Sequence, residues 1–239
     1  MRFVALFPLF FLCSVLPLQA QELTVNLGDG ASLSGRVIQL IALVTVLSLV
    51  PGLAVMITCF PFIVTVLSIL RQAIGLQQSP PNMLIISLAL FLTWFVMDPV
   101  FTEAWTQGLE PLSRGVIDPE EAFRMVLDPF RGFMSTRLDA DTYATLAALR
   151  PDPAPPLTEA PLSLLVPSFL LSEIQRAFEI GFLIYLPFLI IDLVVAAVLM
   201  SMGMMMVPPA IVSMPFKLAF FVVADGWALV SGALVRSYF

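Results

Sequence analysis

The sequence contains a long uncharged run, and the length of this run limits how the chain can fold. The 34 residues from Val37 to Leu70 include no charged side chain. As one straight helix they would extend about 51 Å, whereas the hydrocarbon core of a bilayer is about 30 Å thick. Pro51-Gly52 and Pro61 mark places where such a helix kinks or ends. The run therefore predicts a kinked helix, or a helical hairpin whose buried backbone is covered by neighbouring segments.

The composition indicates a membrane protein that has few of the residue types used in catalysis and metal binding. Mean hydropathy is +1.00, 59% of the residues are hydrophobic and 12% are charged, about half the average for soluble proteins. The net charge of −6 argues against binding to nucleic acid. The chain has no histidine, and its two cysteines are Cys13 and Cys59. We therefore expect no metal, no cofactor and no enzymatic activity.

The first 20 residues have the pattern of a secretory signal peptide. Arg2 provides the positive start, an apolar run extends from Phe3 to Pro17, and Leu18-Gln19-Ala20 is a plausible cleavage site. Cleavage would place Gln21 on the outer side of the cytoplasmic membrane. The alternative interpretation is an uncleaved first membrane span.

The rest of the chain divides by composition into an apolar, a polar and a second apolar region. Helix-type spacing of apolar residues, without strand-type alternation, predicts an all-α, membrane-associated fold. Asp118-Pro119-Glu120-Glu121 predicts a helix start, and Pro215 is expected to break the last apolar helix, Ala210 to Val235. The three regions are residues 21–101 with a loop at 75–82, the periplasmic residues 102–161 with a proline-rich linker at 150–161, and a C-terminal helical hairpin at residues 162–239 with a methionine loop at 200–209.

The methionine loop is an unusual stretch. Five of the chain's twelve methionines lie between Met200 and Pro209. Methionine is flexible and polarisable, and it fills irregular gaps without fixing one geometry. Gly203 loosens the backbone, and Pro208-Pro209 cannot continue a helix that precedes them. The stretch predicts a cap between two apolar helices, which is either a turn buried in a membrane bundle or a soft surface that closes and reshapes.

Five ionisable residues lie within or next to apolar helices, where each needs a partner, a water-filled cavity or a function. Lys217 is the chain's only lysine, and a carboxylate of Glu173 or Asp192 is its expected partner. The alternative is that Lys217 extends to the membrane interface, as Asp225 also could. A proton relay through Asp192 is a further alternative. The five are Asp98, Glu173, Asp192, Lys217 and Asp225.

Several blocks of the sequence, in this order, closely resemble one protein family, the FliP/SctR family of type III export gate proteins. They are residues 70–82 (LRQAIGLQQSPPN), 182–194 (FLIYLPFLIIDLV), 202–209 (MGMMMVPP), 215–218 (PFKL) and 225–227 (DGW). The resemblance extends over nearly all of the chain after about Arg36. The cleavable signal peptide favours the flagellar branch over the SctR type of the injectisome. One departure is Cys59-Phe60-Pro61-Phe62, which stands where members of the family commonly have Ser-Phe-Thr-Arg.

The resemblance implies a pore-forming subunit of the flagellar type III export gate, through which unfolded flagellar proteins pass. It implies a homopentameric ring, joined by FliQ and FliR, whose helical hairpins form a ring-shaped or helical cone. FliO is expected as an assembly factor, and FlhB and FlhA as further partners. The expected location is the bacterial inner membrane within the flagellar basal body, with regions that face the periplasm.

The resemblance also assigns roles to residues. Met204, Met205 and Met206 match a methionine gasket that closes the pore at rest. Glu173 and Lys217 match an ion pair between neighbouring copies, and Arg137 matches its third member. Asp192 lies in the family's Ile-Ile-Asp block, to which the resemblance attaches no role. The alternative from another functional class is a secondary transporter, which predicts paired ionisable groups in two repeats, and the sequence contains no such repeat.

Overall fold

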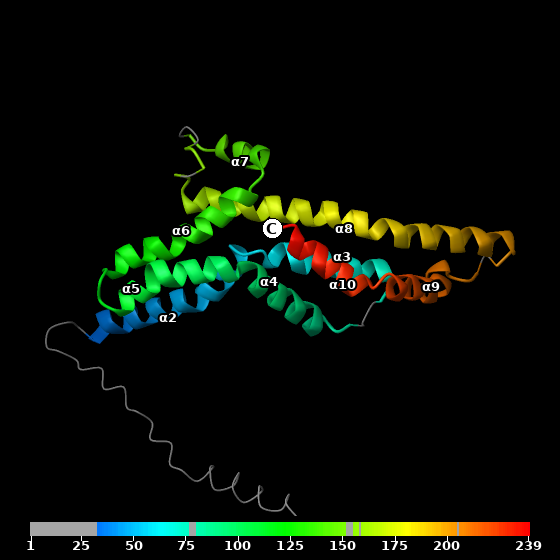
Figure 1. Ribbon diagram of the computed structural model, residues 1–239, viewed down its shortest axis with the longest axis horizontal. Helices are drawn as coiled ribbons and strands as arrows, with labels where there is room; N and C mark the ends of the chain where they lie inside the picture. Colours follow the sequence, from blue (N-terminus) through cyan, green and yellow to red (C-terminus); the bar gives the residue numbers. More distant parts are fainter. Residues whose placement is uncertain (1–32, 77–79, 152–154, 158, 205) are drawn as a thin grey trace, which may run out of the picture. The chain divides into compact units, whose positions relative to one another are not determined.

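The computed structural model describes residues 33–76, 80–151, 155–157, 159–204 and 206–239 (Figure 1). The predicted signal peptide therefore lies outside the described residues. Every regular element in the described part is helical, which confirms the all-α prediction. The chain divides into two compact units, Met1–Val46 and Leu47–Phe239. The described part of the first unit is the beginning of one helix, and the remaining described elements belong to the second unit.

The uncharged run forms two helices, α2 (Leu33–Met56) and α3 (Phe60–Ile74). Helix α2 continues through Pro51-Gly52, and the break falls at residues 57–59, just ahead of Pro61. Pro61 lies in the first turn of α3, where its missing N–H group leaves no helical hydrogen bond unmade. The run is thus divided where a proline is best tolerated.

Helix α3 lies at the centre of the main hydrophobic core. Its apolar residues recur every three or four positions, which places them on faces covered by α4 (Asn82–Ala104) and α8 (Leu162–Ser201). The helix ends at Gly75, whose φ of 88° is a conformation that glycine adopts without strain. The fully buried residues of α3 include Phe62, Ile63, Val66, Leu67 and Ala73.

The next helical segment is long and changes its winding near its end. Helix α4 (Asn82–Ala104) continues into a π-helical turn, η1 (Trp105–Leu109), and then into α5 (Glu110–Ser113). Gly108 of η1 lies so close to helix α6 (Pro119–Arg137) that an added Cβ would lie 2.5 Å from Val126 Cγ2. A glycine at this position therefore lets η1 approach α6 closely.

The polar region packs on the first half of α8 through a second core. Helix α6 (Pro119–Arg137) begins as predicted, because the Asp118 side chain accepts a hydrogen bond of 2.8 Å from Glu121 N. Helix α7 (Ala140–Ala147) begins in the same way at Asp139, which accepts from Thr142 N at 2.8 Å. Hydrogen bonds from the Thr142 backbone N–H and from the Thr142 hydroxyl lower the pKa of the half-buried Asp139 carboxyl below its usual value. The second core contains Met134, Tyr143, Leu164, Leu165 and Phe169.

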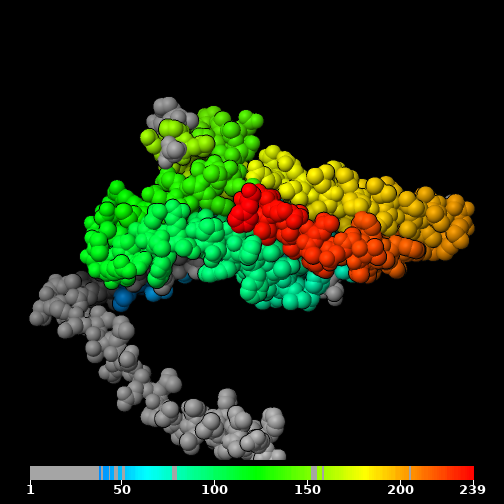
Figure 2. Space-filling view, in the orientation of Figure 1, coloured from blue at the N-terminus to red at the C-terminus, as the bar shows by residue number. Residues whose placement is uncertain are grey.

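The C-terminal hairpin consists of α8 (Leu162–Ser201) and α9 (Pro209–Val223), and α10 (Gly226–Arg236) follows. Figure 2 shows the orange and red surfaces of α9 and α10 beside the yellow surface of α8. The predicted break at Pro215 is wrong, because α9 continues through this residue. The chain instead bends by 62° at Asp225, whose φ of 49° is left-handed. Gly226 allows the bend, since an added Cβ would lie 2.1 Å from the Phe221 ring.

Two of the described helical segments are long and apolar enough to cross a membrane, Asn82–Ser113 and Leu162–Ser201. The bent pair α9 and α10 is a third if it is counted as one broken span. Helix α8 has 40 residues and is therefore about 60 Å long, twice the thickness of the hydrocarbon core. Many of its apolar side chains are exposed, including Phe178, Phe182, Leu183, Ile190, Leu193 and Val198.

Candidate functional site: the methionine turn and two buried ion clusters

The methionine turn, residues 202–208, begins where α8 is closed by a specific hydrogen-bond pattern. Gly203 N donates to Met200 O at 3.0 Å, and Met204 N donates to Leu199 O at 2.9 Å. This pair of bonds around a residue of positive φ is a Schellman motif. Gly203 has a φ of 76°, which a residue with a Cβ adopts only with strain. The sequence thus determines the residue at which the helix stops.

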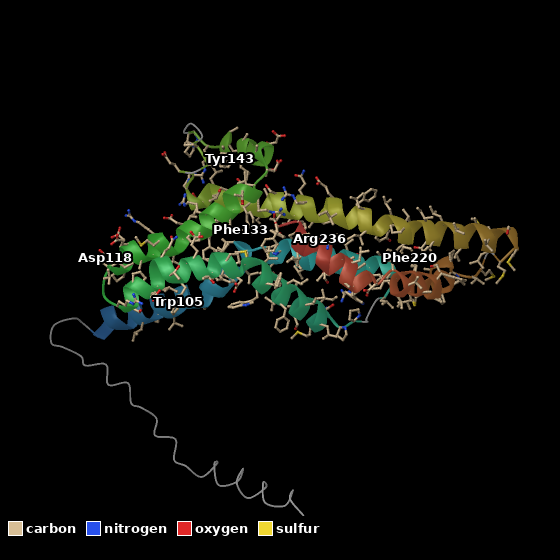
Figure 3. The ribbon with its side chains drawn as sticks, in the orientation of Figure 1. Trp105, Asp118, Phe133, Tyr143, Phe220 and Arg236 are labelled. Carbon is tan, nitrogen blue, oxygen red and sulfur yellow. The ribbon has the colours of Figure 1, made fainter. Side chains whose placement is uncertain are left out.

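Three methionines of the turn are exposed in the part of the chain that the structure describes. Met202 is 67% exposed, Met204 41% and Met206 97%, and Met205 lies outside the described residues. Figure 3 shows sulfur-bearing side chains gathered at this end of the hairpin. A turn buried within its own hairpin is therefore excluded for these three side chains. Within the part of the chain that the structure describes, these three side chains are open to their surroundings.

An apolar cavity of about 580 Å³ lies beneath the turn, between the two arms of the hairpin. Met202 and Met204 form part of its wall, and the other walls come from the last turns of α8 and the first turns of α9. Because the cavity leaves room beside both side chains, they can change rotamer without displacing the helices. The remaining wall residues include Val194, Val198, Val212 and Phe216.

Lys217 is the centre of the first ion cluster. Its Nζ donates to Asp192 Oδ2 at 2.6 Å and to Ala73 O at 3.0 Å. Ser213 Oγ donates to Asp192 Oδ1 at 2.5 Å. The Lys217 side chain is 6% exposed and that of Asp192 is 27% exposed. Of the two carboxylates expected as partners for Lys217, the structure selects Asp192, and the cluster joins α3, α8 and α9.

Glu173 is the centre of the second ion cluster and is fully buried. Arg137 Nε donates to Glu173 Oε1 at 3.2 Å, and Arg176 Nη1 lies 3.7 Å from the same oxygen. The Tyr238 hydroxyl donates to Glu173 Oε2. Burial raises the pKa of Tyr238 far above its usual value, and the charge on Glu173 raises it further, so the hydroxyl stays a donor at neutral pH. The cluster joins α6 and α8 to the residues after α10.

Arg137 holds the chain's last residues through several contacts. Its Nη1 donates to Ser237 O at 2.8 Å, and its Cζ lies 4.1 Å from the centroid of the Tyr238 ring, a cation–π distance. The Tyr238 ring also stacks on Phe133 of α6, with the centroids 6.0 Å apart. Arg137 Nη2 is the one buried side-chain nitrogen or oxygen in the described part of the chain that has no hydrogen-bond partner.

The predicted site residues therefore do not form one site, because they are divided among the methionine turn, the Lys217 cluster and the Glu173 cluster. The structure brings Arg137 to Glu173, but within one chain Glu173 and Lys217 belong to different clusters. A pairing of these two between copies stays a prediction. Asp98 and Asp225 are exposed. Sequence reasoning missed three members, Arg176, Ser213 and Tyr238.

Helical spacing could have indicated two of the missed members. Arg176 follows Glu173 by three residues on α8. Ser213 precedes Lys217 by four residues and therefore lies on the same face of α9. No comparable signal exists for Tyr238, which meets Glu173 across a separation of 65 residues along the chain.

The first prediction concerns the Lys217 cluster. Lys217→Met should destabilise the detergent-purified chain by about 3 kcal/mol, because Asp192 then lies among apolar helices without its cation. Thermal unfolding measures the effect. The double variant Asp192→Asn/Lys217→Met removes both charges and should recover most of the loss. A single variant as stable as the wild type would contradict the assigned pair.

The second prediction concerns Tyr238. Tyr238→Phe removes a hydrogen bond to a charged group and should lower stability by about 2 kcal/mol. Tyr238→Leu also removes the ring from Arg137 and Phe133, so its loss should be larger. Tyr185→Phe is the matched control, since the Tyr185 hydroxyl has no hydrogen bond among the described residues. Equal melting temperatures for the three variants would show that the cluster does not hold the chain's end.

Known proteins have sequences that are similar to this chain over most of its length. The FliP family model matches residues 43–234. The chain is 51% identical over 230 residues to the flagellar biosynthetic protein FliP of Caulobacter vibrioides, covering 95% of this chain and 86% of that one. The protein of the same name from Bacillus subtilis is 45% identical, and the match covers 84% of this chain and 91% of that one. The one from Aquifex aeolicus is 44% identical, and the match covers 92% of each chain. The family match covers both ion clusters except Ser237 and Tyr238, as well as the methionine turn, and the chain belongs to the FliP family.

Proposed function

We propose that this chain is a pore-forming core subunit of the flagellar protein export gate in the bacterial inner membrane, and that it passes unfolded flagellar proteins. Membership of the FliP family supports this proposal, and the relatives, which are named as flagellar biosynthetic proteins, favour the flagellar branch over the injectisome branch. The observation that carries it is the methionine turn, whose Met202, Met204 and Met206 are exposed at the end of an apolar hairpin.

The chemistry of the turn suits a seal that must open for many sequences. Thioether side chains carry no charge and form few hydrogen bonds, so they offer a passing chain nothing that would hold it. The cavity beneath the turn gives Met202 and Met204 space to move. Several copies of Met204, Met205 and Met206 around one axis would close a pore at rest and deform around an unfolded segment.

The apolar surface of α8 supports assembly with other chains. A helix of about 60 Å cannot bury its whole length in a hydrocarbon core of about 30 Å. The remaining apolar surface needs protein partners, since exposed patches of this size are unfavourable in water. We propose a ring of copies of this chain, pentameric as in the family, with FliQ and FliR as further gate subunits. FlhA and FlhB would complete the apparatus, and FliO would assist its assembly.

The third prediction tests the seal. Replacing Met204, Met205 and Met206 together with alanine should raise the leakage of ions and small dyes into cells that contain assembled gates. The reason is that alanine leaves the axis open where the thioether chains closed it. The corresponding triple leucine variant keeps the apolar bulk and should leak less. Met83→Ala, which removes an exposed methionine on α4, serves as the control outside the turn.

Two outcomes would contradict the proposed seal. One is normal assembly with unchanged leakage in the triple alanine variant. The other is a purified single chain that moves a small solute across vesicles, which would favour the secondary transporter.

The fourth prediction separates a contact within the chain from one between copies. If Glu173 also meets Lys217 of a neighbouring copy, Glu173→Gln should reduce the fraction of full-size rings extracted in detergent. Tyr238→Phe disturbs the same cluster but keeps the carboxylate, so its ring fraction should stay close to that of the wild type. Native gel electrophoresis of the extracts measures both. Equal losses in the two variants would assign the cluster to folding of the single chain.

A further inference from the structure

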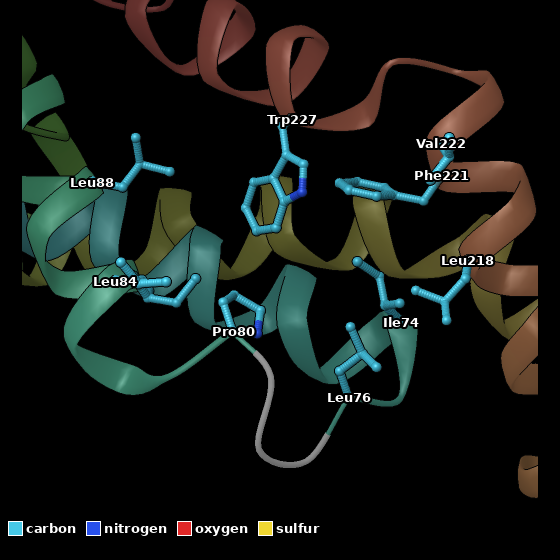
Figure 4. A pocket seen from close by; sticks show the side chains of 10 residues that line it. Ile74, Leu76, Pro80, Leu84, Leu88, Leu218, Phe221, Val222 and Trp227 are labelled. Atoms are coloured by element: carbon cyan, nitrogen blue, oxygen red, sulfur yellow. The ribbon is translucent and has the colours of Figure 1, made fainter.

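A second apolar pocket, of about 520 Å³, opens on a different part of the molecule (Figure 4). It lies where the end of α3, the beginning of α4, and helices α9 and α10 come together. Its volume is within the range of small-molecule pockets, about 300–1,000 Å³. The Trp227 ring projects from α10 into the space between Leu84 and Phe221 (Figure 4). The walls include Ile74, Leu84, Leu88, Leu218, Phe221 and Trp227.

An unneutralised positive charge lies next to the helix ends that form this pocket. Arg71 precedes the wall residue Ile74 by one turn of α3, and it donates a hydrogen bond to Asn82 Oδ1 at the beginning of α4. It is the only charged residue between Val37 and Met97. No ion pair joins Arg71 to any residue that the structure describes. The other cation near the pocket, Lys217, is neutralised by Asp192.

The pocket extends along the axis of α4, which is the first part of a candidate membrane span. Asn82 is the first residue of the span Asn82–Ser113, so it marks the level at which the span begins. Leu84 and Leu88 lie one turn apart on the same helix face, and Leu88 is about 9 Å further along the axis than Asn82. The pocket thus extends from the end of the span into its apolar part. Tryptophan on the opposite wall is typical of the level where lipid headgroups meet the hydrocarbon core.

We infer that this pocket holds one acyl chain of an anionic phospholipid whose phosphate is bound by Arg71. The apolar walls match hydrocarbon, and the charge at the end of the span matches a phosphate. Asn82 accepts from Arg71 through its side-chain oxygen, so its amide nitrogen retains two donors for a phosphate oxygen. An anionic headgroup is favoured over a zwitterionic one because no carboxylate among the described residues pairs with Arg71.

Quenching of Trp227 fluorescence by brominated lipids tests this site in the full chain. A variant with Trp94→Phe and Trp105→Phe keeps Trp227 as its one tryptophan and is reconstituted into phosphatidylcholine vesicles. Phosphatidylglycerol with brominated acyl chains should reach half-maximal quenching at about a five-fold lower mole fraction than brominated phosphatidylcholine. This is the fold-change expected for one basic residue at an anionic surface.

Matched variants distinguish a bound lipid from the general bilayer. Arg71→Gln should abolish the five-fold preference, and Arg71→Lys should keep most of it. In a variant that retains Trp94 of α4 instead, an exposed residue away from the pocket, the two brominated lipids should quench equally. Equal quenching of Trp227 by both lipids would overturn the proposal. Absence of quenching by either lipid would overturn it too, and would indicate that a protein segment covers the pocket.

Discussion

The ammonium group of Lys217 has to be neutralised among apolar helices, and the way this is achieved holds much of the structure in place. Its two acceptors, Asp192 Oδ2 and Ala73 O, belong to α8 and α3, while Lys217 itself belongs to α9. One side chain therefore fixes three helices at a single point. Sliding α9 along α8 would separate the charges and leave each of them in apolar surroundings, which is unfavourable by several kcal/mol. The apolar contacts on either side tolerate small shifts, and the ion cluster does not.

The position of helix α3 shows why the Lys217 cluster matters for the whole fold. The helix is buried by α4 and α8, yet its first residues come directly after a break in an uncharged run. The Glu173 cluster near its beginning and the Lys217 cluster near its end fasten both ends of the same short helix. Phe62 of α3 contacts both Arg137 and Tyr238, and Ala73 accepts from Lys217. The outer faces of α8 and the methionine turn have no such fastening, and these are the surfaces left for other chains.

Sequence reasoning predicted the kinds of element well and their breaks less well. Periodicity identified the helices, and Asp118-Pro119 located a helix start because capping is a local interaction. Pro215 was a misleading signal, since a proline loses one hydrogen bond but neighbouring helices can still hold α9 together. The true bend depends on Asp225 and on the contact between Gly226 and Phe221, which becomes visible only when the helices are packed. The choice of Asp192 over Glu173 for Lys217 and the contact of Tyr238 with Glu173 are long-range, and no local pattern encodes them.

The stop at Gly203 has a consequence for the spacing of the parts. Ser201 follows Asp192 by nine positions on α8, a rise of about 13.5 Å. The backbone conformation at Gly203 prevents the helix from gaining or losing a turn beyond that point. The distance along α8 from the Asp192–Lys217 ion cluster to the methionine turn is therefore the same in every copy of the chain. Copies that are aligned side by side at this ion cluster would hold their methionine turns at one level, without any contact between the turns themselves.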